Sequence, residues 1–328
     1  MTQIGAEIIA REMFGDGGVA YLSTRLQDRL EPYKIGIRVN SLIGEDFIAI
    51  RGQGKTWDEA VARAKEQVKD QQPSTYLQDS RMKVPPKKKK IRRYITLEKY
   101  SRLIETNSLW FARADTLGDP YEGSLPLENL LKRPTEYEQQ VRFFKSIGIS
   151  VKRSLFEYYL AVSESFAKAR LNMFISCWQV SDYESESMWK AYTPGDQGVC
   201  IESDFLSLKA SLISKFYPPI SAGLVKYVDF ETEEIDSNNP HSVVSTKRKE
   251  FESDKELRAI LFQPQFGNKS PFEIPRGIQV TVDTRKLIHR VIVNPYANES
   301  TLNTLKQICE KHGLTAPVQS KLSNPVRF

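Results

Sequence analysis

Hydrophobic and polar residues follow their clearest pattern between positions 92 and 123. Apolar side chains recur there at spacings of three and four residues: Leu97, Tyr100, Leu103 and Ile104. This spacing predicts a helix with one buried face, and the apolar run at 109–112 predicts a strand directly after it. A polar loop rich in acids follows that strand. We therefore expect strand, helix, strand and then a loop of the kind that carries functional residues.

The chain after position 123 alternates between helical and strand patterns. Helical spacing occurs at 134–147, 152–169, 184–192, 205–215, 246–255 and 300–312. Strand patterns occur at 172–178, 198–203, 223–229, 258–263, 277–283 and 291–293. We therefore expect an α+β fold over residues 92–328, with a mixed β-sheet core surrounded by helices.

Residues 1–75 predict a separate, small α+β module. Its expected elements are a helix at 4–14, strands at 33–39 and 46–51, and a helix that starts after a capping-box sequence at 56–59. This order resembles a double-stranded-RNA-binding domain, although the lysine cluster that opens the second helix of such domains is absent.

The sequence GQGKT at 52–56 is similar to a phosphate-binding loop. That motif requires a glycine where Ala49 stands. A turn from a hairpin into a helix accounts for both glycines without any phosphate.

Residues 76–91 predict a basic linker between the two parts. Pro85 and Pro86 interrupt helix and sheet alike, and the four lysines that follow repel one another. Eight basic residues and no acid lie between positions 81 and 93, so without them the formal net charge of +6 would be −2. The strip fits a solvated hinge, a nuclear import signal, or an arm that binds RNA or DNA phosphates. The residues of such an arm would be Lys87, Lys88, Lys89, Lys90 and Arg92.

Composition argues against several classes of protein. The three cysteines and three histidines are scattered, with no spacing typical of a metal site or a disulfide framework, so we expect no metal. No apolar run reaches about 18 residues, and the N-terminal segment carries acids, so we expect no transmembrane helix, no secretory signal and no membrane partner. We expect a reducing, cytoplasmic location. The oligomeric state stays open.

Glu256 and Arg258 are the first candidates for chemistry. They stand at the start of an apolar strand pattern, where alternation sends both to one face and Leu257 and Ala259 to the other. The two charges are therefore expected within reach of each other. They would form either part of a site or an ion pair that orders the sheet.

Arg93 and Arg113 are candidates for binding an anion. Arg93 opens the first strand of the larger domain with Tyr94, and Arg113 directly follows the strand at 109–112. A guanidinium binds phosphate or carboxylate through two parallel hydrogen bonds, which lysine does poorly. The alternative for Arg93 is a solvated position at the end of the basic strip.

The segment ESESMWKAY at 184–192 predicts a short amphipathic helix. Glu186, Trp189 and Lys190 lie about one turn apart on it. Trp189 and Tyr192 would either pack into the core with Met188 or stack on a nucleobase or nicotinamide ring.

Several separated motifs resemble domain-of-unknown-function family 2971, which is widespread among bacterial proteins. They are Arg93-Tyr94, Leu109 to Gly123, Ser176 to Tyr192, Lys247 to Arg258, and His312 to Leu322. The resemblance covers roughly residues 92–322 and identifies 92–328 as a domain of this kind. It implies a fold but says little about chemistry, because the family is defined without a known function.

The order of these parts is also similar to that of ADP-ribosyltransferases, enzymes that use NAD. The similarity is architectural, since the chain has no HGT, HYE or Ser-Thr-Ser signature. It implies an arginine that holds the NAD phosphates, aromatic side chains around the nicotinamide, and a glutamate that stabilises the ribose as nicotinamide leaves. The catalytic residues implied are Glu256, Arg93 and Tyr94. The NAD-binding residues implied are Arg93, Tyr94, Trp110, Arg113, Trp189, Tyr192 and Arg258.

Three functions follow from these observations. The first is an NAD-using, ADP-ribosyltransferase-like enzyme that acts as a bacterial toxin or anti-phage effector, with nucleic acid as one acceptor. The second is a non-enzymatic nucleic-acid-binding or regulatory protein that uses the basic strip. The third is a metal-dependent nuclease built on Asp115, Asp119 and Glu122, whose spacing matches no recognisable motif.

Overall fold

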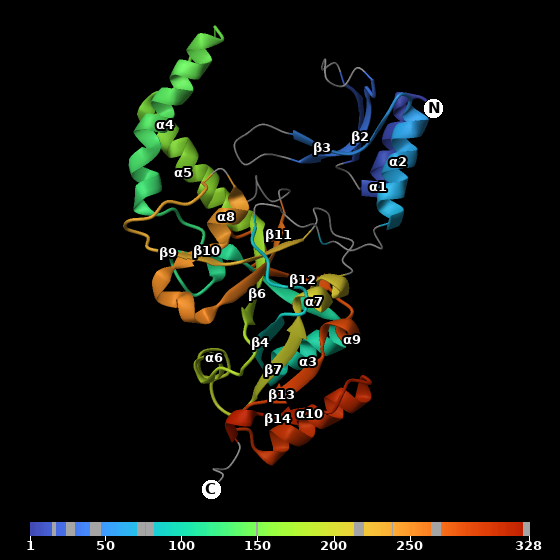
Figure 1. Ribbon diagram of the computed structural model, residues 1–328, viewed down its shortest axis with the longest axis vertical. Helices are drawn as coiled ribbons and strands as arrows, with labels where there is room; N and C mark the ends of the chain where they lie inside the picture. The colour runs from blue at the N-terminus through green and yellow to red at the C-terminus, as the bar shows by residue number, and fades with distance from the viewer. Residues whose placement is uncertain are drawn as a thin grey trace.

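A small N-terminal module and a larger α+β domain make up the protein (Figure 1). The computed structural model describes residues 1–14, 18–23, 30–39, 47–70, 76, 82–148, 150–212, 220–237, 239–263 and 270–323.

The N-terminal module is a three-stranded antiparallel sheet packed against two helices. Its elements are α1 (Gln3–Phe14), β1 (Gly18–Leu22), β2 (Tyr33–Val39), β3 (Phe47–Gly54) and α2 (Trp57–Asp70). Small side chains from both helices form most of its core, so the helices lie close to the sheet. At Gly52 a Cβ atom would lie 2.2 Å from the main-chain oxygen of Ala60, which explains why glycine is needed there. Strand β1 was not among the expected elements, because its five residues lie beside a glycine-rich sequence and show little alternation.

The larger domain is built on a mixed sheet, which confirms the expected fold class. Its strands are β4 (Lys90–Thr96), β5 (Ser108–Arg113), β6 (Met173–Val180), β7 (Gly198–Asp204), β8 (Ser221–Leu224), β11 (Glu256–Phe262), β12 (Gly277–Thr281), β13 (Arg290–Val293) and β14 (Val318–Gln319). Within the described residues they run in the order β12-β5-β6-β4-β7-β13-β14, while β11 pairs with β6 and β8. A separate parallel pair joins β9 (Lys226–Val228) to β10 (Thr246–Arg248).

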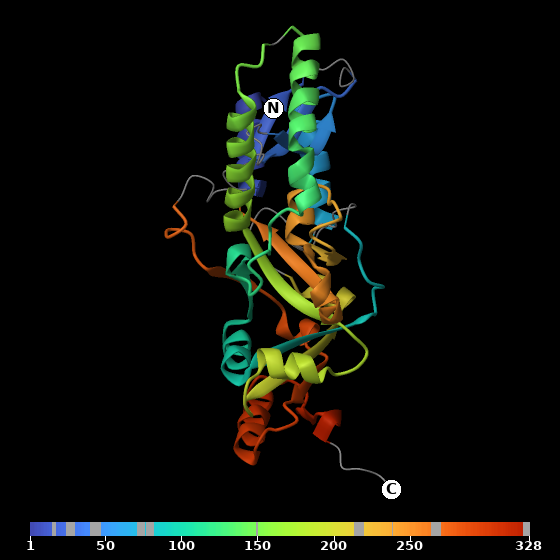
Figure 2. The ribbon, with the colours of Figure 1, turned by 90° about the vertical axis from the view of Figure 1, so that its left-hand side faces the viewer.

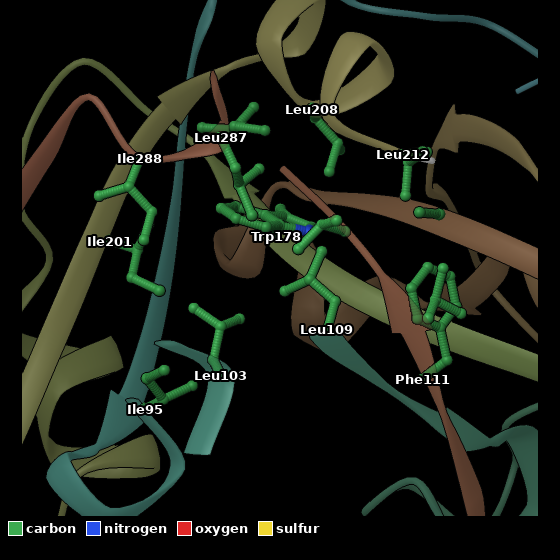
Figure 3. Packing of buried hydrophobic residues seen from close by; sticks show 14 of the residues in the cluster. Ile95, Leu103, Leu109, Phe111, Trp178, Ile201, Leu208, Leu212, Leu287 and Ile288 are labelled. Carbon is green, nitrogen blue, oxygen red and sulfur yellow. The ribbon is translucent and has the colours of Figure 1, made fainter. Parts of the chain in front are cut away.

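One face of the sheet carries the main hydrophobic core. Four helices cover this face: α3 (Leu97–Thr106), α7 (Phe205–Ser211), α9 (Thr284–Leu287) and α10 (Glu299–Lys311). Figure 3 shows Leu208 and Leu287 from these helices around Trp178 of β6 and Phe111 of β5. The expected buried face of α3 is confirmed, since Tyr100, Leu103 and Ile104 are all buried. A smaller cluster on the opposite face holds α6 (Glu186–Tyr192) against the sheet.

The helices α4 (Leu127–Ser146) and α5 (Leu155–Asn172) form a hairpin that projects away from the sheet (Figures 1 and 2). The expected helix at 134–147 starts seven residues earlier than its pattern indicated, and Pro134 lies inside it. A proline there removes one intrahelical hydrogen bond without ending the helix. A further short helix, α8 (Pro240–Val244), precedes β10. None of the described helices is long and apolar enough to cross a bilayer.

The expected helix at 246–255 is wrong. This segment forms β10 followed by the 3-10 helix η4 (Lys249–Asp254). Its charged residues show helical spacing, but the main chain of β10 pairs with β9 instead. The expected strand at 223–229 is likewise two strands, β8 and β9, that belong to different sheets.

Burial of apolar side chains on the main core face, aromatic ones among them, stabilises the larger domain. We predict that Phe111→Ala, at a fully buried position, lowers the free energy of unfolding by about 3–5 kcal/mol through lost burial and a cavity. The matched control is Phe272→Ala, at a position that is 98% exposed, and it should change stability by no more than about 0.5 kcal/mol. Urea unfolding followed by circular dichroism measures both. Equal effects of the two substitutions would contradict the assignment of the core.

Candidate functional site

The sheet splits beside its central strand β6. Along one edge of β6, strand β5 pairs with residues 174–175 and strand β4 pairs with residues 179–180. Residues 176–178 lie outside both ladders, so β4 and β5 separate there. The opposite edge of β6 pairs with β11 over its whole length, which keeps β6 extended across the split.

Arg93 of β4 occupies this split. Its guanidinium donates hydrogen bonds to Ser176 Oγ on β6 and to the main-chain oxygen of Trp110 on β5, the latter at 3.1 Å. It also lies 5.8 Å from the centre of the Trp178 ring. Arg93, which belongs to β4, thus links β4 to both β5 and β6 at the point where β4 and β5 separate.

The guanidinium of Arg93 differs from its neighbours in its partners. The neighbouring arginines Arg92, Arg113 and Arg258 each pair with a carboxylate, whereas none lies within 4.0 Å of Arg93 among the residues that the structure describes. Loss of hydration lowers the pKa of Arg93, and the nearby Cys177 and Tyr192 partly oppose that shift. A partly desolvated cation without a counter-ion is suited to binding an anionic ligand.

Two partly exposed aromatic side chains belong to the same region. Trp110 is 45% exposed and rests on Gly277 of β12, where a Cβ atom would lie 2.2 Å from the indole ring. Tyr192, at the end of α6, is 46% exposed. Burial and the carboxylate of Glu256 raise the pKa of Tyr192 to about 12, so its hydroxyl stays protonated at neutral pH.

A buried network of charges lies on the neighbouring strand β11. Arg258, only 1% exposed, donates from Nη1 and Nη2 to the two oxygens of Glu122 at 2.6 and 2.7 Å, and from Nε to Glu256 at 2.9 Å. The expected proximity of Glu256 and Arg258 is therefore confirmed. A third contact, from Nη1 to the main-chain oxygen of Val244 at 2.7 Å, uses the remaining edge of the guanidinium.

Lys247 of β10 completes the network. Its Nζ donates to Glu256 at 2.6 Å and to Asp254 at 2.8 Å. Burial alone would raise the pKa of Glu256, but Arg258 and Lys247 outweigh it and lower that pKa to about 2. Three carboxylates face two cations, so the network of Glu122, Lys247, Asp254, Glu256 and Arg258 carries a formal charge of −1.

Cys177 lies on the sheet face of the network, whereas its neighbours Ser176 and Trp178, which contact Arg93, lie on the opposite face. Cys177 is the direct partner of Arg258 in the β6–β11 register. Burial and the carboxylates of Glu256 and Glu122 raise the pKa of its thiol to about 12, against the opposing effect of Arg258 and Arg93. The thiol is therefore protonated at neutral pH, which does not suit a nucleophile.

The main chain is strained immediately before Glu256. Lys255 ends η4 with φ 47° and ψ 53°, a left-handed conformation that non-glycine residues seldom adopt. The surrounding contacts must compensate for this strain, and residues of this kind cluster at functional sites.

Three of the other predicted ligand-binding residues are buried and already engaged. Tyr94 and Trp189 pack edge to face, with ring centres 4.9 Å apart, and the Tyr94 hydroxyl accepts a hydrogen bond from the main chain of Ser185. All three guanidinium nitrogens of Arg113 are used, by Asp115 and by the main-chain oxygens of Pro271 and Ile274. Of the residues predicted to bind NAD, the partly exposed ones are Arg93, Trp110 and Tyr192.

The basic strip is largely neutralised where it enters the sheet. Lys89 pairs with Asp182, and both Lys90 and Arg92 pair with Glu202 of β7. Lys90 and Arg92 are strand residues of β4 rather than parts of a flexible arm. Lys87 and Lys88 remain exposed.

The acids proposed for a nuclease each have a different arginine partner. Asp115 pairs with Arg113, Asp119 with Arg248, and Glu122 with Arg258. Across the described residues, no group of three potential metal ligands converges.

Sequence reasoning missed the residues that hold the predicted ones in place. Ser176 anchors Arg93, and Lys247 holds Glu256. Both lie inside the segments that carry the family resemblance, Ser176 to Tyr192 and Lys247 to Arg258, but neither residue type indicated its partner. The sequence separation of 83 residues between Arg93 and Ser176 hides that contact from any local pattern.

The loop before α6 is tied to the C-terminal segment. Glu184 accepts hydrogen bonds from Trp189 Nε1 of α6 and from Ser320 Oγ and the Lys321 main chain. The helix that carries Tyr192 is thus fixed by residues far along the chain.

A separate open cavity of about 590 Å³ lies beside the C-terminal end of α6. It is lined by Trp189, Lys190, Thr193, Pro194, Gly195, Asp196, Asn294 and Tyr296. None of the network residues lines it. Its buried amide, on Asn294, already donates to Thr193 and Gly195, so this cavity offers no free buried polar group at that position.

Comparison with protein families gives one match. The model of a family described as a protein of unknown function (DUF2971) matches residues 188–260. This region includes Tyr192, Lys247, Glu256 and Arg258. Comparison with curated proteins and with solved structures gave no match.

Glu256 makes stability depend on pH. Its pKa of about 2 in the folded protein is below the ordinary value of 4.5, so its contribution is present above pH 4.5 and is lost as the pH falls towards 2. We predict that this loss amounts to about 3 kcal/mol of unfolding free energy and is absent in Glu256→Gln, which is already destabilised at neutral pH. Urea unfolding at several pH values measures it. The control is Glu310→Gln at an exposed position; the prediction fails if Glu256→Gln and the wild type show the same pH dependence.

Proposed function

We propose that this protein is an ADP-ribosyltransferase-like enzyme that binds NAD at the split of the sheet. Arg93 would hold the pyrophosphate, and the partly exposed rings of Trp110 and Tyr192 would contact the nicotinamide. We further propose that this enzyme acts as a bacterial toxin or anti-phage effector.

The observation that supports this proposal most is the acid-free guanidinium of Arg93. The neighbouring arginines Arg92, Arg113 and Arg258 are each matched by a carboxylate, whereas the buried Arg133 of α4 resembles Arg93 in contacting a serine hydroxyl and an aromatic ring. Arg93 uses neutral acceptors, Ser176 and a main-chain oxygen, which keep it in place and leave its positive charge uncompensated. A pyrophosphate supplies the missing charge and matches the planar donors of a guanidinium.

The residues on β11 fit the second requirement of this reaction. When an ADP-ribosyltransferase acts, the bond between ribose C1′ and the nicotinamide nitrogen breaks, nicotinamide keeps the electron pair, and the acceptor loses a proton as it bonds to C1′. Positive charge develops on the ribose, and fixed negative charge nearby lowers the barrier. The charge network supplies a net charge of −1, with Glu256 ionised at any physiological pH.

Glu256 supports this chemistry through its charge. Both of its oxygens accept hydrogen bonds, one from Lys247 and one from Arg258. These bonds fix the orientation of the carboxylate and keep it ionised. Direct contact between Glu256 and the ribose would require Lys247 to release its oxygen.

The alternative functions receive less support from the geometry. A metal-dependent nuclease needs carboxylates that converge, whereas Asp115, Asp119 and Glu122 pair with separate arginines. A nucleic-acid arm retains Lys87 and Lys88 as its exposed cations. Two lysines are too few for strong nucleic-acid binding by themselves. Their presence makes nucleic acid one class of acceptor to test.

Removal of the Arg93 guanidinium tests the proposal directly. We predict that Arg93→Ala weakens NAD binding about 10- to 100-fold, because a hydrogen-bonded ion pair contributes about 1.5–3 kcal/mol. Arg93→Lys should recover only part of the affinity, since lysine cannot make the bidentate contact. Calorimetric titration with NAD measures binding, and release of nicotinamide in the presence of RNA, DNA or lysate protein measures turnover.

The matched control is Arg285→Ala, at an exposed arginine of α9. It should leave NAD binding unchanged, and thermal unfolding of each variant verifies that it folds. Absence of NAD binding and of nicotinamide release in the wild-type protein would refute the proposed function, as would equal affinity in Arg93→Ala and wild type.

A further inference from the structure

The free end of the α4–α5 hairpin exposes an unusual amount of apolar surface. We call residues 142–148 and 150–160 the hairpin tip. Its exposed apolar side chains are Phe143 (60% exposed), Ile147 (55%), Leu155 (38%), Phe156 (70%) and Leu160 (48%). Exposed apolar side chains gathered at one end of a hairpin are typical of a contact site.

Between the tip and the base of the hairpin the described helices expose no large apolar side chain, although Leu127, Leu130 and Leu131 are exposed at the base of α4. Phe143 of α4 lies one turn before Ile147, which caps that helix, and the positions that continue their row towards the sheet are the exposed Gln139 and Gln140. On α5 the row of Phe156 and Leu160 continues as the exposed Ser163 and Glu164. A partner that packed lengthwise along the hairpin would therefore meet polar side chains over most of its length.

The tip is also positively charged. Arg142, Lys145, Lys152 and Arg153 are all exposed, and Glu157 is the single acid in the two described ranges, which gives a formal charge of +3. Arg142 pairs with Glu138, one turn outside these ranges, at 3.1 Å. Glu157 caps its own helix through Ser154, so it does not neutralise a basic side chain of the tip by a close ion pair.

We propose that the hairpin tip binds an anionic lipid surface, with its aromatic and aliphatic side chains in the interface and its basic side chains on the lipid headgroups. This combination of apolar and cationic residues is the one that peripheral membrane contacts use. The binding is independent of the NAD site. It departs from the expectation of no membrane partner, and it requires no membrane-spanning helix.

The shape of the tip favours a lipid surface over a protein partner. Figures 1 and 2 show that the hairpin projects from the larger domain with its end free. A stable protein interface buries about 800 Å² on each partner, which the end of two helices supplies only inside a matching groove. A fluid lipid surface adapts to a convex tip and needs no preformed groove.

Vesicle flotation with the full-length protein tests the proposal. The wild-type protein should float with vesicles of phosphatidylcholine and phosphatidylserine, and much less with vesicles of phosphatidylcholine alone. Lys152→Glu combined with Arg153→Glu should weaken binding about 30-fold or more, because each basic residue near such a surface contributes about 1 kcal/mol. Phe143→Ser combined with Phe156→Ser should reduce it as well, and high salt should weaken the wild type.

The matched control is Leu131→Ser, which removes an apolar side chain that is 61% exposed at the base of the same hairpin. It should leave flotation unchanged. Equal recovery on charged and neutral vesicles, or no effect of the tip substitutions, would overturn the proposal. So would light scattering that shows a wild-type dimer converted to a monomer by the tip substitutions without any lipid binding, since the tip would then be a protein interface.

Discussion

The buried ion pair between Arg258 and Glu122 is the constraint on which the candidate site depends. A guanidinium that is 1% exposed must have its charge and its donors matched within the protein. Glu122 meets that need from the loop after β5, Glu256 from β11 itself, and Val244 from the end of α8. The same demand recruits Lys247, because two buried carboxylates need a second cation. Four separate segments are thereby fixed around one side chain, and replacement of any partner leaves an unmatched charge inside the domain.

The split of the sheet gives Arg93 a role that differs from that of Arg258. Arg258 lies within a continuous ladder between β6 and β8 and is saturated by acids. Arg93 lies where two ladders end, and its two hydrogen bonds go to uncharged oxygens. Both arginines act to lower the pKa of Cys177. Arg258 has its charge matched by carboxylates, and Arg93 does not have a carboxylate partner among the described residues.

Local sequence patterns predicted most of the helices and strands, and they predicted one contact of the site, between Glu256 and Arg258. The other contacts of the site join residues that are far apart in the sequence. Strand alternation placed Glu256 beside Arg258, because both lie on one strand with a fixed repeat. Periodicity failed at 246–255, where pairing of β10 with β9 overrides helical spacing. It also could not distinguish Arg93 from Arg113. Arg93 opens one apolar strand and Arg113 follows another, so their local patterns are alike. They differ because Arg113 donates hydrogen bonds to Asp115 and to two main-chain oxygens more than 150 residues away. Which charges find partners at such separations is a property of the assembled fold.

The contact of Glu184 with Ser320 and Lys321 has a consequence for the order in which the protein matures. Protein chains are synthesised from the N-terminus, and early segments fold while later ones are still being made. The strands that carry Arg93, Cys177 and Glu256 can assemble before residue 320 has left the ribosome, but the loop that positions Tyr192 gains its final anchor only afterwards. Until residues 318–321 emerge, the nascent sheet lacks strand β14, and the loop before α6 lacks the contacts of Glu184 with Ser320 and Lys321.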